Sequence, residues 1–192
     1  MSRMKMPPTR NDIIKLVDSC KTPGAKLAVG LAAFSGLHPR QVKGLLFRNL
    51  VEFSLAKKQF LEVPSRIQML EAVGNRRATV VRYYTFLSSR GCDWLREDLR
   101  TRHQAFSPDA GVVTAQSFSQ ADRVVRAAGF HWHDLRDLFH SYCVLANVPH
   151  AVVDFMLGYV LSKDDVLDRM SLLREVDYVR MKYAEVEEQF SV

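Results

Sequence analysis

The strongest constraint on the fold is a change of sequence periodicity in the middle of the chain. Between about Phe53 and Leu87 the segments FLEV and VVRYYTF are rich in β-branched and aromatic residues, and the turn-prone stretch VGNRR separates them. Before and after this region, apolar residues recur at helical spacing. The pattern predicts a mainly α protein with one small antiparallel β-sheet, an α+β fold in which about six to eight helices surround the sheet.

Turn and capping signals divide the helical regions. Thr9 can cap the start of a helix, Pro23-Gly24 breaks the chain, and Gly36 is typical of a residue that ends a helix. The helices predicted in this way cover about residues 10–20, residues 26–35, a segment that begins at Pro39, the stretches SSRGCDWLREDLRTR and SFSQADRVVRAAG, and the chain from His133 to the C-terminus.

The 192 residues suit one ordinary domain with its own core. We expect residues 1–8 (MSRMKMPP) to be a flexible basic arm, residues 9–192 to form a single domain, and residues 174–192 to be a C-terminal tail helix. The composition, with 47% hydrophobic and 25% charged residues, is that of an average globular protein. It excludes disordered, collagen-like and coiled-coil classes and leaves enzymes and binding modules open.

Charge is distributed unevenly along the chain. The formal net charge is +6, but residues 164–192 hold eight acidic and four basic side chains, a local charge of −4. The preceding 163 residues therefore carry +10. A basic body of this size predicts a polyanionic partner, because lysine and arginine that neutralise phosphates release condensed counterions. Ordinary solubility charge is the alternative.

Cysteine use and hydropathy indicate the compartment. Cys20, Cys92 and Cys143 are odd in number, widely spaced and not preceded by an apolar signal segment, so we expect reduced thiols and a cytoplasmic protein. The longest apolar stretches are far shorter than the roughly 20 residues of a membrane span, so we expect no membrane partner.

The segment HWHDLRDLFHSYCVLA carries the clearest chemistry. Its spacing predicts a helix with an apolar stripe formed by Leu135, Leu138, Phe139, Tyr142 and Leu145. His133 and Arg136 lie on another side of this helix, one turn apart. An imidazole beside a permanent, bidentate cation suits one phosphate with two non-bridging oxygens, whereas the structural alternative is a surface helix with an ordinary ion pair.

The same region places His131, His133, His140 and Cys143 close together in sequence. These residues lack the paired spacing of familiar zinc sites, and the first two straddle the start of the helix. We therefore predict no metal site.

Several motifs follow one another along the chain: the turn SGLHP, the sheet ending RYYTFLSSRG, the helix HDLRDLF, the element VVDFMLGY and the closing MKYAEVEEQF. In their order and spacing, over about residues 25–190, the chain resembles the tyrosine recombinases, or phage integrases, especially their archaeal members. The resemblance implies a tyrosine recombinase catalytic-domain fold, double-stranded DNA as partner, and a role in DNA integration and recombination. It also implies an association with the nucleoid, or an origin in a mobile element or virus.

Such a recombinase holds a DNA phosphate in a pocket with two arginines, a lysine, a His-x-x-Arg pair, a further histidine or tryptophan, and a nucleophilic tyrosine. The tyrosine attacks the phosphate and forms a 3′-phosphotyrosyl bond, which frees a 5′-hydroxyl, while the cations stabilise the transition state. The resemblance implies no metal and no cofactor, because the covalent bond conserves the phosphodiester energy.

Carried over to this sequence, the resemblance assigns catalytic positions to His133 and Arg136, the His-x-x-Arg pair. The first arginine normally follows the Gly-Leu of the turn, but here His38 stands in that place and Arg40 follows two residues later. His38 lies just before Pro39, at a helix N-terminus that favours an anion, so we expect a weaker and pH-dependent phosphate contact there.

Other positions of the pocket also differ. Tyr159 aligns with the second histidine or tryptophan and can donate one hydrogen bond. The hairpin that normally carries the lysine contains none, and arginine is a poor general acid because it gives up its proton reluctantly. The basic side chains that we expect to contact DNA are Arg66, Arg76, Arg77, Arg82 and Lys43.

The nucleophile is the largest departure. It is expected about eight to ten residues after Tyr159, where this chain reads Leu167-Asp168-Arg169. Tyr183 matches a tyrosine that the relatives carry in their last helix besides the nucleophile, so we expect it to serve core or interface packing. Tyr178 could act as the nucleophile only if this segment has shifted its register.

Three functions remain open from the sequence. The first is a DNA-binding member of the family that does not cleave, and the second is an active recombinase that uses Tyr178 or a tyrosine from another subunit. The third is a protein-interaction module whose acidic C-terminal helix docks on a neighbouring copy, which would make a homo-oligomer, although its apolar spacing fits docking on its own chain equally well. We also expect the N-terminal helical domain that closes such recombinases around DNA to be absent, through truncation or supply by a separate chain.

Overall fold

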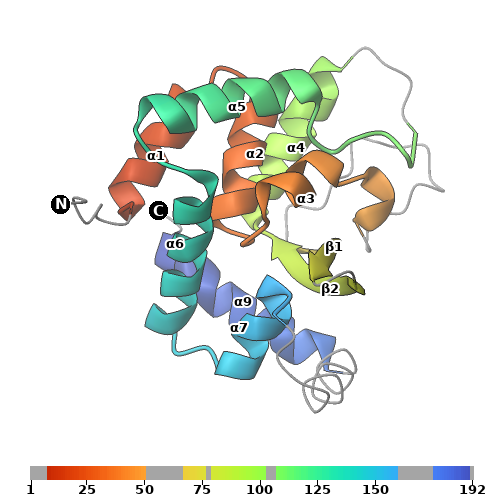
Figure 1. Ribbon diagram of the computed structural model, residues 1–192, viewed down its shortest axis with the longest axis vertical. Coiled ribbons are helices and arrows are strands. Elements are labelled where there is room, and N and C mark those ends of the chain that lie inside the picture. The colour runs from red at the N-terminus through yellow and green to blue at the C-terminus, as the bar shows by residue number, and fades with distance from the viewer. Residues whose placement is uncertain (1–7, 51–66, 77–78, 103–106, 160–174, 191–192) are drawn as a thin grey trace.

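The computed structural model describes residues 8–50, 67–76, 79–102, 107–159 and 175–190. Within these ranges the chain forms eight α-helices, a short 3-10 helix and one two-stranded sheet (Figure 1). In chain order the elements are α1 (Arg10–Ser19), α2 (Pro23–Ala33), α3 (Pro39–Gly44), η1 (Phe47–Asn49), β1 (Gln68–Arg76), β2 (Thr79–Leu87), α4 (Ser89–Thr101), α5 (Ala115–Ala127), α6 (Trp132–Leu145), α7 (His150–Leu157) and α9 (Val176–Phe190). The predicted mainly α fold with one small antiparallel sheet is confirmed.

The sheet is a hairpin whose strands pair from Gln68 opposite Leu87 to Arg76 opposite Thr79. The segment VVRYYTF lies in β2, as predicted. The predicted turn at VGNRR is wrong for its first four residues, which belong to β1, because the ladder continues to the pair of Arg76 with Thr79. The segment FLEV lies outside the described residues.

Side chains at the helix starts explain where the first helices begin. The Thr9 hydroxyl accepts the Asp12 backbone N–H at 3.3 Å, and the Asp12 carboxylate accepts the Thr9 backbone N–H at 2.8 Å, so the predicted cap of α1 is confirmed. The predicted break at Pro23-Gly24 is wrong. Thr22 caps α2 there, and proline fits the first turn of a helix, where its missing N–H is not needed.

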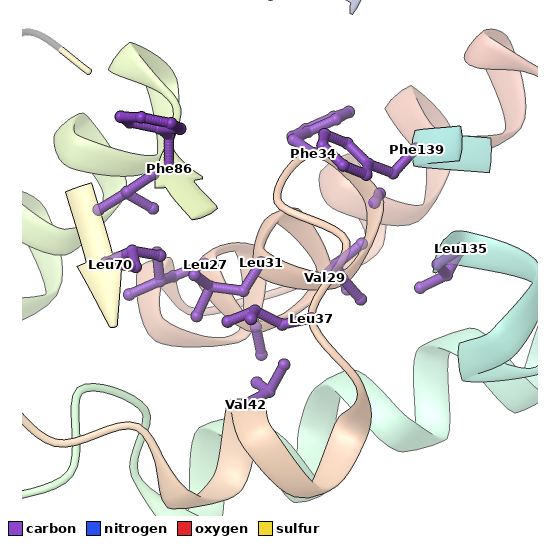
Figure 2. Packing of buried hydrophobic residues seen from close by; sticks show 14 of the residues in the cluster. Leu27, Val29, Leu31, Phe34, Leu37, Val42, Leu70, Phe86, Leu135 and Phe139 are labelled. Atoms are coloured by element: carbon purple, nitrogen blue, oxygen red, sulfur yellow. The ribbon is translucent and has the colours of Figure 1, made fainter. Parts of the chain in front are cut away.

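Helix α2 is the centre of the core. It consists mainly of small and apolar residues that are buried, and α1, α3, α4, α5 and α6 all pack against it (Figure 1). Figure 2 shows Leu70 and Phe86 of the hairpin on one side of α2 and Leu135 and Phe139 of α6 on the other. Segments from distant parts of the sequence are therefore fixed relative to one another through α2.

The turn between α2 and α3 lies against β2, α6 and α7. The Thr85 hydroxyl of β2 donates to the Ser35 carbonyl at 2.7 Å. Gly36 adopts a φ of +66°, and a Cβ atom there would lie 2.6 Å from Phe139 of α6 and 2.7 Å from Leu157 of α7. Glycine is therefore required both by the backbone conformation and by the space available. The turn brings the Gly36 carbonyl close to α6.

The C-terminal helix α9 packs on its own chain. The Phe190 ring stacks on Phe34 with 4.3 Å between centroids, and the Tyr183 hydroxyl donates to the Phe34 carbonyl at 2.8 Å. The Glu187 carboxylate accepts the Ser89 backbone N–H at 2.7 Å, at the start of α4, where the helix dipole favours a negative charge. The apolar face of α9 is thus covered in cis, and exchange of this helix between copies stays a prediction.

Within the described ranges, no helix combines the length and the apolar character that crossing a membrane requires. The three cysteines, Cys20, Cys92 and Cys143, are buried thiols. Burial raises the pKa of Cys20 to about 11 and that of Cys143 to about 12, so neither offers a reactive thiolate near neutral pH.

Candidate functional site

The first turns of α6 carry the predicted His-x-x-Arg pair. The buried residues of the predicted apolar stripe are Leu135, Leu138, Phe139 and Tyr142. The prediction for Leu145 is wrong: its side chain is 65% exposed, because α6 ends there and the chain turns through Asn147 at a φ of 52°. On the outward side of the helix, His133 is exposed and Arg136 is half-buried.

Arg136 connects three segments of the chain. Its Nη1 donates to the Gly36 carbonyl at 2.8 Å, and its Nη2 donates to the Leu157 carbonyl at 2.5 Å. These contacts hold the guanidinium group where the turn after α2 and the end of α7 meet α6. Both acceptors are uncharged, so the guanidinium keeps its positive charge for a further partner.

His38 is the N-cap of α3 and faces His133. Its Nδ1 accepts the Arg40 backbone N–H at 3.2 Å, which assigns the proton of the neutral ring to Nε2. The His38 and His133 ring centroids lie 5.0 Å apart, with 64° between the ring planes. Burial lowers the pKa of His38, and the neighbouring His133, Arg136 and Arg40 lower it further. These effects favour a neutral His38 imidazole, and a bound anion would offset the repulsion among the positive groups around it.

Tyr159 covers one side of Arg136. The chain leaves α7 through Gly158 at a φ of +71° and continues directly into Tyr159, which is 39% exposed. The Arg136 Cζ atom lies 5.2 Å from the centre of the Tyr159 ring, within the range of a cation–π contact. The structure thus brings together four of the predicted site residues: His38, His133, Arg136 and Tyr159.

Two further residues of the site were not predicted from the sequence. Tyr83 of β2 is 2% exposed, and its hydroxyl donates to Gln41 Oε1 at 2.6 Å. The same Gln41 oxygen accepts the His38 backbone N–H at 2.8 Å. Two signals could have identified them. Gln41 stands three residues after the N-cap of a helix, and a tyrosine in a buried strand needs a partner for its hydroxyl.

The basic residues predicted to contact DNA lie elsewhere or are not described. Arg40, the candidate for the displaced catalytic arginine, is exposed on α3 beside His38. Lys43 is at the other end of α3, where its Nζ lies 4.5 Å from the centre of the Phe118 ring. The structure describes only the backbone of Arg76 and Arg82, and Arg66 and Arg77 lie outside the described residues.

The two tyrosines of α9 differ in exposure. Tyr183 is fully buried against Phe86, with 5.2 Å between ring centroids, and burial raises its pKa well above the usual range. Its predicted role in core packing is confirmed. Tyr178 is half-buried in the first turn of α9, with Lys182 Nζ 6.0 Å from its ring centre. Positions 167 to 169, where the nucleophile is expected, lie outside the described residues.

A guanidinium, two imidazoles and a phenol therefore meet at one place on the molecule. All of them can donate hydrogen bonds, and one carries a permanent positive charge. This set of groups suits an anion with several oxygen acceptors. Among the described side chains, no three of the His, Cys, Asp and Glu residues converge as metal ligands would.

A solved structure of a phage protein has a similar fold. The integrase from mycobacterium phage Brujita superposes on this chain with a TM-score of 0.58 at 16% sequence identity. The similarity covers 97% of this chain and 64% of the integrase. No protein-family model matches the sequence, and no curated protein matches it. The chain therefore has an integrase-like fold, mainly helical with a two-stranded antiparallel sheet, as predicted.

Proposed function

We propose that this chain is a DNA-binding protein of the tyrosine recombinase family and that it holds one backbone phosphate of a duplex at the site around Arg136. The convergence of Arg136 and His133 of α6 with His38 at the start of α3 carries this proposal. A phosphodiester presents one negative charge and two non-bridging oxygens, which match a guanidinium with neighbouring imidazole donors. The integrase-like fold supports the choice of DNA as the source of that phosphate.

The charge of the chain also favours a nucleic-acid partner. Residues 1–163 carry a formal charge of +10, whereas the acidic charge is concentrated in residues 164–192. Contacts to phosphates position a protein on the duplex without reading its sequence. We therefore expect the protein to bind duplex DNA of any sequence, with an affinity that falls steeply as the salt concentration rises. We expect it to act in the cytoplasm, on the nucleoid or on mobile DNA.

In this proposal the protein binds duplex DNA without cutting it. Leu167 stands where the resemblance places the nucleophile, and a leucine cannot form a phosphotyrosyl bond. Tyr183 does not replace it, because its hydroxyl is buried and donates to the Phe34 carbonyl. A chain that occupies DNA in this way would compete with an active recombinase or recruit one.

Nicked duplexes of varied sequence test binding and cutting together, because a nick traps a covalent intermediate by letting the freed fragment diffuse away. We expect fluorescence anisotropy to show binding and denaturing gels to show no covalent protein–DNA product. A covalent product that disappears in Tyr178→Phe would instead establish an active recombinase. A product that survives this substitution would point to a tyrosine from elsewhere. Absence of binding at low salt would contradict the proposal itself.

Acid should strengthen DNA binding. The pKa of His38 lies below its ordinary value of 6.5 in the free protein, because of burial and of the positive groups around it. A bound phosphate raises this pKa. At a pH between the His38 pKa of the free protein and that of the complex, DNA binding is therefore accompanied by uptake of a proton. Affinity at constant salt should therefore rise as the pH falls from about 8 to about 6. The rise should stay below the roughly tenfold per pH unit of full proton uptake, because His38 Nδ1 also caps α3.

The stability of the free protein should change in the opposite direction and fall as the pH falls. Since the His38 pKa is lower in the folded chain than in the unfolded chain, the unfolded chain binds more protons, and His38 disfavours folding as the pH falls through its ordinary pKa. His38→Gln should reduce both pH dependences. The matched control is His150→Gln, since His150 is exposed on α7 and pairs with Asp154. An affinity of the unmodified protein that is constant over this pH range would contradict the prediction.

A further inference from the structure

We infer that Tyr83 and Gln41 form a buried positioning pair that holds Arg136 and His38 in place for phosphate binding. This inference rests on the function proposed above. Neither residue needs to touch the DNA: Tyr83 is buried, and Gln41 is half-buried within the first turn of α3. Gln41 nevertheless accepts a hydrogen bond from the His38 backbone, and Tyr83 lies beside Arg136.

The direction of the hydrogen bonds supports this arrangement. Gln41 Oε1 accepts two of them, from the Tyr83 hydroxyl at 2.6 Å and from the His38 backbone N–H at 2.8 Å. An amide oxygen cannot donate, so the Tyr83 proton points toward Gln41, and the phenol oxygen keeps its lone pairs for another donor. The Arg136 guanidinium lies near this phenol, and its positive charge opposes the rise that burial causes in the pKa of Tyr83.

Packing around Tyr83 leaves it little freedom to move. A Cβ atom added at Gly158 would lie 2.6 Å from Tyr83 Cδ1 and 2.7 Å from Cε1, so the backbone after α7 closes directly over the ring. The adjoining Leu157 carbonyl is itself an acceptor for Arg136. The guanidinium is therefore held by the turn after α2 and by the end of α7, and Tyr83 packs against this same end of α7. Gln41 links this assembly to the N-cap of α3.

Tyr83→Phe removes the hydroxyl and keeps the buried ring. We expect it to weaken duplex binding about three- to tenfold, the usual effect of one lost hydrogen bond between neutral groups. Tyr84→Phe is the matched control, because Tyr84 is the neighbouring strand residue and its ring stacks on Phe155 at 6.3 Å. Its affinity should equal that of the unmodified protein. Binding is measured by anisotropy at one salt concentration, at a temperature well below each unfolding midpoint.

A double-mutant cycle separates positioning from a general structural role. If Tyr83 acts through the guanidinium, Tyr83→Phe should weaken binding in the normal background and add less than about twofold in an Arg136→Lys background. Gln41→Met provides a second variant, which should weaken binding to a similar extent and add little to Tyr83→Phe. A structural role alone would lower the unfolding midpoint and leave the affinity of the folded protein unchanged.

The outcomes distinguish this inference from the function on which it rests. If the unmodified protein does not bind duplex DNA, the proposed function fails. If it binds, and Tyr83→Phe binds as tightly as Tyr84→Phe, only the positioning pair is overturned. Equal losses for Tyr83→Phe in the normal and Arg136→Lys backgrounds would also overturn it.

Discussion

Replacing Arg136 with alanine should weaken duplex binding by about a hundredfold, the loss expected when a charge-assisted, bidentate contact to a phosphate is removed. The loss should be similar for unrelated DNA sequences, because a phosphate contact carries no base information. The measurement is the dissociation constant by anisotropy for several duplexes at one salt concentration. A loss that varied strongly with sequence would contradict a phosphate role for Arg136.

Arg123→Ala is the matched control, since it removes the same charge from an exposed position on α5. We expect it to change affinity by less than about twofold, as is usual for a surface charge away from a binding site. Arg136 also joins three segments through the Gly36 and Leu157 carbonyls, so the unfolding midpoint of each variant is measured alongside its affinity. Equal losses from both variants would indicate that only net charge matters.

Replacing Tyr183 with alanine should lower the free energy of unfolding by about 3–5 kcal/mol, the range for a large aromatic side chain removed from a core. Tyr183 is fully buried and packs against Phe86 and Phe139, and its hydroxyl bonds to the Phe34 carbonyl. The variant would also loosen α9 from the rest of the chain. Urea unfolding followed by circular dichroism measures the change.

Tyr183→Phe distinguishes the core role of this residue from a catalytic one. The substitution keeps the ring and removes one buried hydrogen bond, which should cost about 1–2 kcal/mol of stability. Because Tyr183 lies away from solvent, duplex binding by the folded variant should be unchanged. Normal stability combined with lost DNA binding would show that the residue acts at the site and not in the core.

The helices could be predicted from the sequence because their signals are local. Thr9 and Asp12 cap α1 through residues three apart, and the apolar spacing of α6 identifies its buried side as far as Tyr142. The errors arose where a local signal had two meanings. Pro23-Gly24 can break a chain or open a helix, and only the cap at Thr22 decides between them.

The site was only partly predictable because its contacts join distant segments. Arg136 and Gly36 are 100 residues apart in the chain, and Tyr83 and Gln41 are 42 apart. These pairs form because the hairpin and α6 pack on opposite sides of α2, and no local sequence pattern predicts that packing. His133 and Arg136 were accessible to sequence reasoning because they share one helix. Tyr83 and Gln41 each carry a local signal, but only the fold shows that they meet.

The salt dependence of duplex binding tests the central claim, that Arg136 holds a DNA phosphate, most directly. Each phosphate contact contributes about 0.9 to the slope of log affinity against log salt concentration. Arg136→Ala should therefore reduce this slope by about one, whereas Arg136→Lys, which keeps the charge and loses the bidentate geometry, should lose affinity and keep the slope. An Arg136→Ala protein with the slope of the unmodified protein would contradict the claim, because Arg136 would then neutralise no phosphate.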